Sequence, residues 1–157
     1  MECYTDGSCN KVSCGAGVFI PQLQHESAIG LGKTCTVFQA EMFAILNATT
    51  YLIESNVKGC SIEIFTDSLA SVNSLNKVCT KSSIVQQCIT ALNRLGETNA
   101  VNVTWIKGHS NCPGNVHADY LARIGSKRLF IGPEPSLPLL DCLWKQEIRS
   151  ECCKSTP

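Results

Sequence analysis

The sequence lacks the features of several protein classes. No apolar run approaches the roughly 20 residues that a helix needs to cross a bilayer, so we expect no membrane association. The first residues contain no basic segment followed by an apolar stretch, so we see no signal peptide and expect an intracellular protein, in the nucleus, the cytoplasm or both. There is no internal repeat and no low-complexity tract, and 157 residues suit a single globular domain.

The sequence also lacks an excess of charge of either sign. Thirteen Lys and Arg residues balance thirteen Asp and Glu residues, which gives a formal net charge of zero. A protein that binds nucleic acid usually has a basic excess, because phosphate neutralisation supplies most of its affinity. If the ligand is a nucleic acid, we therefore expect bound cations or a tethered partner domain to supply the missing attraction.

Cysteine, in contrast, is unusually frequent. The chain has 11 cysteines, an odd number, with no CxxC pair and no export signal. Disulfide scaffolds are typical of short secreted chains. We therefore predict free thiols that serve as small apolar residues in a reducing compartment. We do not expect zinc at His109, Cys112 and His117, because no second cysteine pair completes a tetrahedral site.

Hydrophobic periodicity predicts an α/β domain. Short or alternating apolar runs predict strands, and apolar residues at three- and four-residue spacing predict helices. The expected strands cover residues 3–8, 15–20, 27–35, 61–66 and 100–106. The expected helices cover residues 36 or 37 to 55, 68–77, 83–95 and 115–128. The first three strands have short connections, which predicts an antiparallel meander, and the alternation that follows predicts two strands added in parallel.

The composition changes near residue 130. A proline-rich stretch begins at Gly132, and residues 140–153 have a pattern that predicts one more helix. We therefore divide the chain into a domain over residues 1–130 and a C-terminal extension over residues 131–157.

Four acidic residues stand at unusual positions. Asp6 and Asp67 each lie at the end of an expected strand, and adjacent parallel strands are only about 4.8 Å apart. Glu41 falls within the apolar stripe of an expected helix, where a carboxylate is costly unless it is paired, protonated or bound to a metal. Asp119 opens the last expected helix, four residues before Arg123.

Each of these acids has an alternative explanation when it is considered alone. Asp6 is also a typical turn residue, Asp67 a typical helix N-cap, and Glu41 a plausible acid at the edge of its helical stripe. Asp119 is also a typical acid at a helix start. Four converging carboxylates would repel one another, however, and oxygen-only ligands select hard cations such as Mg²⁺ or Mn²⁺. Together they predict a metal centre.

Five short blocks in order give the chain a family resemblance. They are Tyr4-Thr5-Asp6-Gly7-Ser8, Gln39-Ala40-Glu41, Phe65-Thr66-Asp67-Ser68, Trp105-Ile106-Lys107-Gly108-His109, and Pro113-Gly114-Asn115 continuing to Asp119 and Ala122. On these blocks the chain resembles type I ribonucleases H over about residues 3–126. Residues 35–41 and 130–135 are similar to the domains of non-LTR retrotransposon reverse transcriptases. The resemblance implies a ribonuclease H-like fold, with a five-stranded mixed sheet flanked by helices.

The resemblance also implies an activity. It is endonucleolytic hydrolysis of the RNA strand of RNA–DNA hybrids, which gives 5′-phosphate and 3′-hydroxyl ends. The protein would be a monomer, and a reverse transcriptase domain would precede it in the parent polyprotein. Two Mg²⁺ ions, or Mn²⁺ in their place, would lie roughly 4 Å apart, one generating hydroxide and one stabilising the departing 3′ oxygen. Their ligands would be Asp6, Glu41, Asp67 and Asp119. His109 would transfer protons or assist product release.

Further residues are implied to contact the substrate. The backbone at Gly7, Ser8 and Cys9 would approach the RNA 2′-hydroxyl groups, with Asn10 beside it. Asn115 would orient the loop before the last helix. The remaining candidates for contact with the hybrid or its phosphates are Gln39, Lys107, Arg123, Lys127 and Arg128.

The chain departs from the family pattern at three places. Val37 and Phe38 stand where many members carry an Asn-Gln pair, Val116 stands where glutamate is common, and the connection over residues 77–82 has no basic handle helix. We therefore expect modest affinity for the hybrid. Two alternatives are a non-catalytic nucleic-acid-binding remnant and another nuclease or integrase-like member of the superfold. The four carboxylates argue against the first, and the block over residues 105–109 argues against the second.

Overall fold

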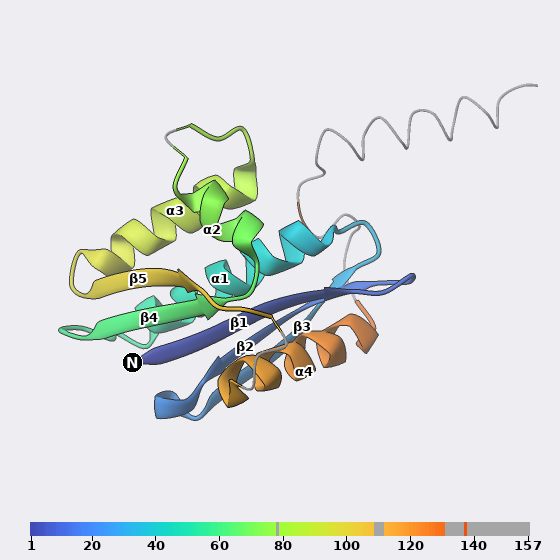
Figure 1. Cartoon of the computed structure of the whole chain (residues 1–157), viewed down its shortest axis with the longest axis horizontal. Coiled ribbons are helices and arrows are strands. Elements are labelled where there is room, and N and C mark those ends of the chain that lie inside the picture. The colour runs from blue at the N-terminus through green and yellow to red at the C-terminus, as the bar shows by residue number, and fades with distance from the viewer. Residues whose placement is uncertain (78, 109–111, 131–136, 138–157) are drawn as a thin grey trace, which may run out of the picture.

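The computed structural model describes residues 1–77, 79–108, 112–130 and 137. These residues form a five-stranded sheet with helices on both faces (Figure 1). The elements are β1 (Glu2–Cys9), β2 (Cys14–Ile20), the 3-10 helix η1 (Pro21–Leu23), β3 (His25–Gly32), α1 (Val37–Glu54), β4 (Ser61–Thr66), α2 (Leu69–Leu75), α3 (Ser83–Gly96), β5 (Ala100–Trp105) and α4 (Pro113–Lys127). None of the described helices is long and apolar enough to span a membrane.

The sheet has the strand order β3-β2-β1-β4-β5. β1 pairs antiparallel with β2, and β2 with β3, whereas β1 pairs parallel with β4, and β4 with β5. This arrangement confirms the predicted α/β fold with a three-stranded meander and two parallel additions. Helices α1, α2 and α3 lie on one face of the sheet, and α4 packs against β1, β2 and β3 on the other (Figure 1).

Two element boundaries differ from the prediction near the candidate site. β3 ends before the predicted 35, at Gly32, whose positive φ of 76° takes the chain out of the extended conformation, and the capping box of Thr36 and Gln39 then starts α1. α4 begins at Pro113, two residues earlier than predicted, because proline needs no backbone donor in the first turn of a helix. The helix predicted over residues 140–153 lies outside the described residues, and the domain division at residue 130 stays a prediction.

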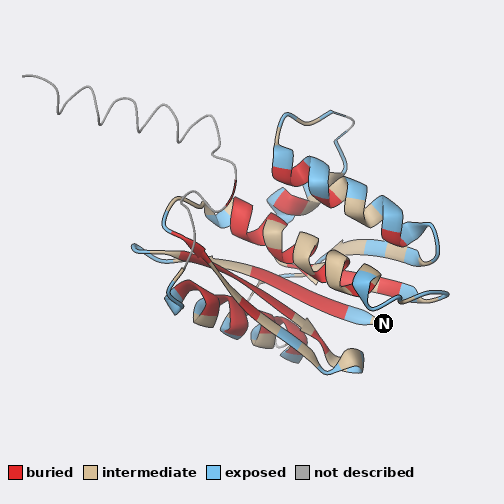
Figure 2. Cartoon of the chain, turned by 180° about the vertical axis from the view of Figure 1, so that it is seen from behind, coloured by how far each residue is buried: buried red, intermediate tan, exposed pale blue. Residues whose placement is uncertain are grey.

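Helix α4 lies directly on strand β2. A Cβ atom at Gly17 would lie 2.2 Å from the carbonyl oxygen of Ala118, so only glycine permits this approach. Gly17 is the β2 partner of Asp6 in β1. The close packing therefore holds α4, which carries Asp119, against the part of the sheet that carries Asp6. Buried residues line the sheet-facing sides of both α1 and α4 (Figure 2).

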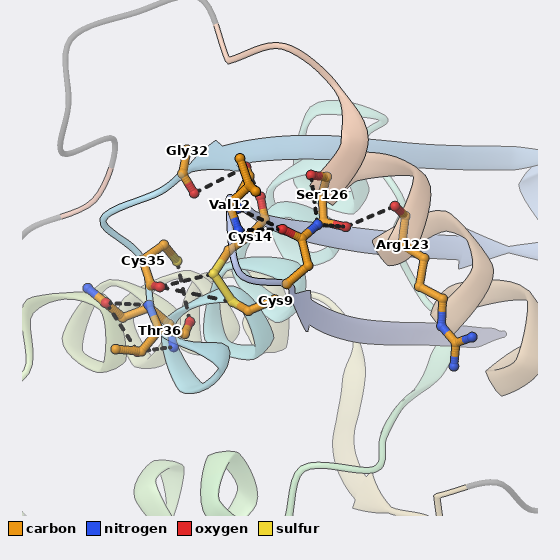
Figure 3. The surroundings of a disulfide bond; sticks show 11 residues. Cys9, Val12, Cys14, Gly32, Cys35, Thr36, Arg123 and Ser126 are labelled. Atoms are coloured by element: carbon orange, nitrogen blue, oxygen red, sulfur yellow. Dashed lines mark hydrogen bonds between the residues drawn. A yellow bond between two sulfur atoms is a disulfide. The ribbon is translucent and has the colours of Figure 1, made fainter.

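The cysteines are only partly as predicted. Cys9 and Cys14 form a disulfide at the turn end of the β1–β2 hairpin (Figure 3). The prediction of free thiols is wrong for this pair, because the antiparallel register places the two residues opposite each other with Cα atoms 4.0 Å apart. Cys3, Cys60, Cys79, Cys88 and Cys112 are free thiols as predicted, and of these five Cys3 and Cys88 are buried. Burial raises the pKa of Cys3 and of Cys88 to about 12, so both thiols stay protonated as small apolar groups.

Candidate metal centre

Three of the four predicted carboxylates converge. Asp6, Glu41 and Asp67 each offer a carboxylate oxygen, and these atoms all lie within 4.8 Å of one another. The register of the parallel strands explains the meeting of the two aspartates, since Thr5 of β1 pairs with Thr66 of β4 and the next residue in each strand is the aspartate. Asp6 is not at the end of β1 as predicted, because β1 continues along β2 after β4 has ended.

Glu41 comes to this point from the early part of α1. Its side chain is buried and one oxygen, Oε2, has no hydrogen-bond partner in the described part of the chain. The Glu41 carboxylate accepts hydrogen bonds from the Gly7 backbone N–H and from the Thr66 hydroxyl. Gly7 is required for this approach, because a Cβ atom there would lie 2.4 Å from the Glu41 backbone nitrogen. An unpartnered buried carboxylate oxygen is what a cation would satisfy.

The electrostatics of the cluster also require a counter-charge. Burial, followed by the negative charge of Asp67 and then of Asp119, raises the pKa of Asp6 to about 8. Burial, followed by the charges of Asp6 and Asp67, raises the pKa of Glu41 to about 9. With pKa values this high, Asp6 and Glu41 carry a negative charge at neutral pH only if a cation binds beside them. Three carboxylates with no nitrogen or sulfur donor suit a hard divalent ion.

Asp119 lies beside the cluster but is engaged elsewhere. Asp119 falls in the second turn of α4 and not at the helix start as predicted. Both of its carboxylate oxygens contact the Arg123 guanidinium, at 2.9 Å each. It is outside the three-carboxylate set, although its charge contributes to the raised pKa of Asp6. That Asp119 completes the ligand set therefore stays a prediction.

Sequence comparisons agree with this arrangement. The RNase H family model matches residues 1–127. The chain belongs to the RNase H family. It is similar to the ribonuclease H of Bartonella bacilliformis, with 32% identity over 138 residues that cover 78% of this chain and 86% of that protein. It is also similar to the ribonuclease HI of Pasteurella multocida, with 29% identity over 142 residues that cover 81% of this chain and 90% of that protein.

RNases H are enzymes that cleave the RNA strand of RNA–DNA hybrids, and they generally use a divalent metal ion. The cluster of Asp6, Glu41 and Asp67 supplies a suitable donor set for such an ion in this RNase H. Family membership and the chemistry of the cluster therefore indicate the same kind of site.

The chain after β5 runs against the cluster. A Cβ atom at Gly108 would lie 2.8 Å from Oδ2 of Asp67, and the Trp105 indole donates a hydrogen bond of 3.0 Å to the Asp67 carbonyl oxygen. Lys107 is exposed between these two residues. His109 lies outside the described residues, so its predicted role stays a prediction. The residue follows directly on a glycine that contacts a cluster side chain.

The predicted RNA-contacting segment forms the end of β1. Gly7, Ser8 and Cys9 are half-buried, and Asn10 is exposed. The Asn10 side chain accepts hydrogen bonds from two backbone N–H groups of the hairpin turn and donates to Ser126 of α4. Asn10 therefore positions the tip of the hairpin, and its predicted contact with RNA stays a prediction.

Two further predicted contact residues are buried. Gln39 is fully buried, and its Oε1 accepts hydrogen bonds from the backbone and hydroxyl of Thr36. This places Gln39 in the start of α1 and not on a surface that a substrate reaches. Asn115 is buried in α4, with an Oδ1 atom that has no partner among the described residues.

Sequence reasoning missed two residues that shape the site. Thr66 is fully buried and its hydroxyl is a hydrogen-bond partner of the Glu41 carboxylate. Trp105 fixes the end of β4 through the Asp67 carbonyl oxygen. Both belong to the blocks that carry the family resemblance, but only the strand register reveals what their side chains contact.

The raised pKa values predict that the metal-free protein loses stability as pH rises. Below about pH 4 the folded and unfolded chains both carry protonated Asp6 and Glu41. Between about pH 4 and pH 9 the unfolded chain ionises these groups while the folded chain retains their protons, so the free energy of unfolding falls. The expected result is a decrease in the free energy of unfolding across this range, because the unfolded chain releases protons that the folded chain retains. Chemical denaturation in a chelating buffer across this range measures it.

Excess Mg²⁺ should reverse this loss at the alkaline end, because a cation that binds only the folded state stabilises it. A metal-free protein whose stability is constant or rises over this pH range would contradict the described cluster.

Proposed function

We propose that this RNase H is an endonuclease that hydrolyses the RNA strand of RNA–DNA hybrids with two Mg²⁺ ions, leaving 5′-phosphate and 3′-hydroxyl ends. The observation that supports this proposal is the convergence of Asp6, Glu41 and Asp67, with a buried and unpartnered oxygen on Glu41. When bound, the cations supply activation of the attacking water and stabilisation of charge on the phosphate and the departing oxygen.

The chain's own residues hold and orient the reacting groups. Asp6, Glu41 and Asp67 are proposed ligands, and Thr66 keeps the Glu41 carboxylate in place. Asp119 is the proposed fourth ligand. A carboxylate oxygen has two acceptor positions, so Asp119 can bind a cation without releasing Arg123.

The residues around this set are assigned to the substrate. His109 moves protons at the scissile phosphate or assists product release, because it follows Gly108, which lies against Asp67. Lys107 contacts a phosphate, the backbone of residues 7–9 meets the RNA 2′-hydroxyl groups, and Asn115 orients the loop before α4.

We further propose that the chain acts in reverse transcription of a retroelement, as an intracellular monomer downstream of a reverse transcriptase. The support for this context is the sequence of residues 35–41 and 130–135, which is similar to domains of non-LTR retrotransposons. A bound reverse transcriptase domain would also supply the basic surface that a chain of zero net charge lacks.

A cleavage assay tests the proposed activity. Purified protein is incubated with a labelled RNA–DNA hybrid, duplex RNA and duplex DNA, with Mg²⁺, Mn²⁺ or a chelator. We expect cleavage of the hybrid RNA alone, lost with the chelator, and products whose 5′ ends carry phosphate. Binding of the hybrid without cleavage would support the alternative of a non-catalytic remnant. Cleavage of duplex DNA would indicate another nuclease of the superfold.

A further inference from the structure

A basic groove lies away from the acidic cluster, at the tip of the β1–β2 hairpin. It has a volume of about 720 Å³, and four exposed cations line it: Lys11, Lys33, Lys127 and Arg128. Among the described residues that line this groove there is no Asp or Glu. The chain as a whole has 13 Lys and Arg residues and no net charge, so this groove is a local concentration of positive charge. We call these four residues and the cavity between them the hairpin groove.

The hairpin groove is assembled from three separate segments. Lys11 is in the turn after β1, Lys33 follows β3, and Lys127 and Arg128 end α4. Cations at the end of a helix are stabilised by its dipole, which accounts for Lys127 and Arg128. It does not account for Lys11 and Lys33, which belong to the sheet side of the groove. The convergence of these segments therefore points to an anionic ligand.

The tip that carries Lys11 is held firmly. The Cys9–Cys14 disulfide closes the hairpin (Figure 3). The Asn10 side chain donates to the Ser126 carbonyl oxygen at 3.3 Å and to its hydroxyl at 3.2 Å. On the far side, the Arg128 guanidinium donates to the Ala28 carbonyl oxygen of β3. The hairpin backbone that carries Lys11 and the Arg128 guanidinium are therefore held before an anion binds, which lowers the conformational freedom lost on binding.

The groove stands in line with the metal centre, because β1 carries both. Asn10 comes four positions after Asp6, which is about 13 Å at the rise of an extended strand. In a B-form duplex, successive phosphates of one strand rise about 3.4 Å along the helix axis, so this spacing corresponds to roughly four base pairs along that axis.

We propose that the hairpin groove binds the phosphate backbone of the RNA–DNA hybrid about four nucleotides or more from the cleaved bond. This inference rests on the proposed function. It also extends the predicted phosphate contacts, since it adds Lys11 and Lys33 and omits Arg123, which is paired with Asp119. The groove would supply the attraction that the zero net charge of the chain does not.

A triple variant tests the hairpin groove. Lys11→Gln/Lys33→Gln/Lys127→Gln removes three cations and leaves Arg128, which has a structural hydrogen bond. The matched control is Lys58→Gln/Lys81→Gln/Arg94→Gln, which removes three exposed cations outside the groove. Binding of a labelled 20-base-pair hybrid is measured with a chelator, so that no turnover occurs, over a series of salt concentrations.

We expect the groove variant to bind the hybrid at least about tenfold more weakly than wild type at low salt. Its plot of log affinity against log salt should be less steep, with a slope smaller in magnitude by about two to three. The control variant should keep the wild-type slope, and its kcat with saturating hybrid and Mg²⁺ should stay within about twofold of wild type. Equal slopes for the two variants would overturn the groove proposal. Failure of the wild-type protein to cleave the hybrid would instead overturn the proposed function, which separates the two.

Discussion

Replacing Asp67 with asparagine is expected to lower the rate of hybrid cleavage by at least about a thousandfold while the fold is retained. The Asp67 carboxylate lies within 4.8 Å of those of Asp6 and Glu41, so the change removes one anionic donor from the proposed ligand set. Loss of about 4 kcal/mol of transition-state stabilisation corresponds to three orders of magnitude in rate. Initial rates on labelled hybrid with saturating Mg²⁺ measure the effect.

The fold should survive this change for an electrostatic reason. Asp67 raises the pKa of both buried neighbours, so its neutral analogue relieves repulsion in the metal-free protein. The matched control is Glu97→Gln, which makes the same change of charge at an exposed position after α3 and should keep the wild-type rate. A variant at position 67 that cleaves within tenfold of wild type would refute the assignment of the site.

Replacing Glu41 with glutamine is expected to abolish cleavage and, at the same time, to raise the melting temperature of the metal-free protein at about pH 7. Glu41 is buried, its pKa is raised to about 9, and its Oε2 has no partner among the described residues. Glutamine has the same shape, carries no charge, and can donate from its amide to the neighbouring carboxylates. A gain of about 1–3 kcal/mol would raise Tm by several degrees in a protein of this size.

Thermal unfolding with a chelator and with excess Mg²⁺ separates the two effects. Wild-type protein should gain stability from Mg²⁺, and the Glu41→Gln variant should gain little, because it has lost a ligand. Glu54→Gln, an exposed glutamate at the last position of the same helix, is the control and should behave as wild type. A Glu41→Gln variant that is less stable than wild type without metal would show that the carboxylate is not under repulsive strain.

Much of this fold could be predicted from the sequence, because burial in a sheet leaves a simple periodic pattern. β4 was expected over residues 61–66 and is observed as Ser61–Thr66, since Ile62 and Ile64 alternate with less buried residues. The meeting of Asp6 and Asp67 could also be predicted, because each follows the last position at which β1 and β4 pair. Glu41 was predicted from the cost of a carboxylate on an apolar helix face.

Other features depend on register and could not be predicted. The disulfide needs Cys9 and Cys14 to be the last opposed pair of the hairpin, and 11 cysteines offer many other pairings. Asp119 lies in the second turn of α4 and pairs with Arg123 four residues later, and the spacing of the two residues did not show that this pair forms. Gln39 belongs to one of the motifs, but the motif does not reveal that its side chain accepts a hydrogen bond from the Thr36 backbone in the capping box of α1.

The pairing of β1 with β4 has a consequence for how the catalytic apparatus comes into being. The meander of β1, β2 and β3 is built from contacts between neighbours in the chain, whereas Glu2 of β1 pairs with Glu63 of β4 across α1. Such a distant pairing closes a long loop and is slow to form. A nascent chain can thus fold its first hairpins on the ribosome while Asp6 still lacks the neighbour that β4 delivers. Nuclease activity is therefore acquired late, when the two halves of the sheet have joined.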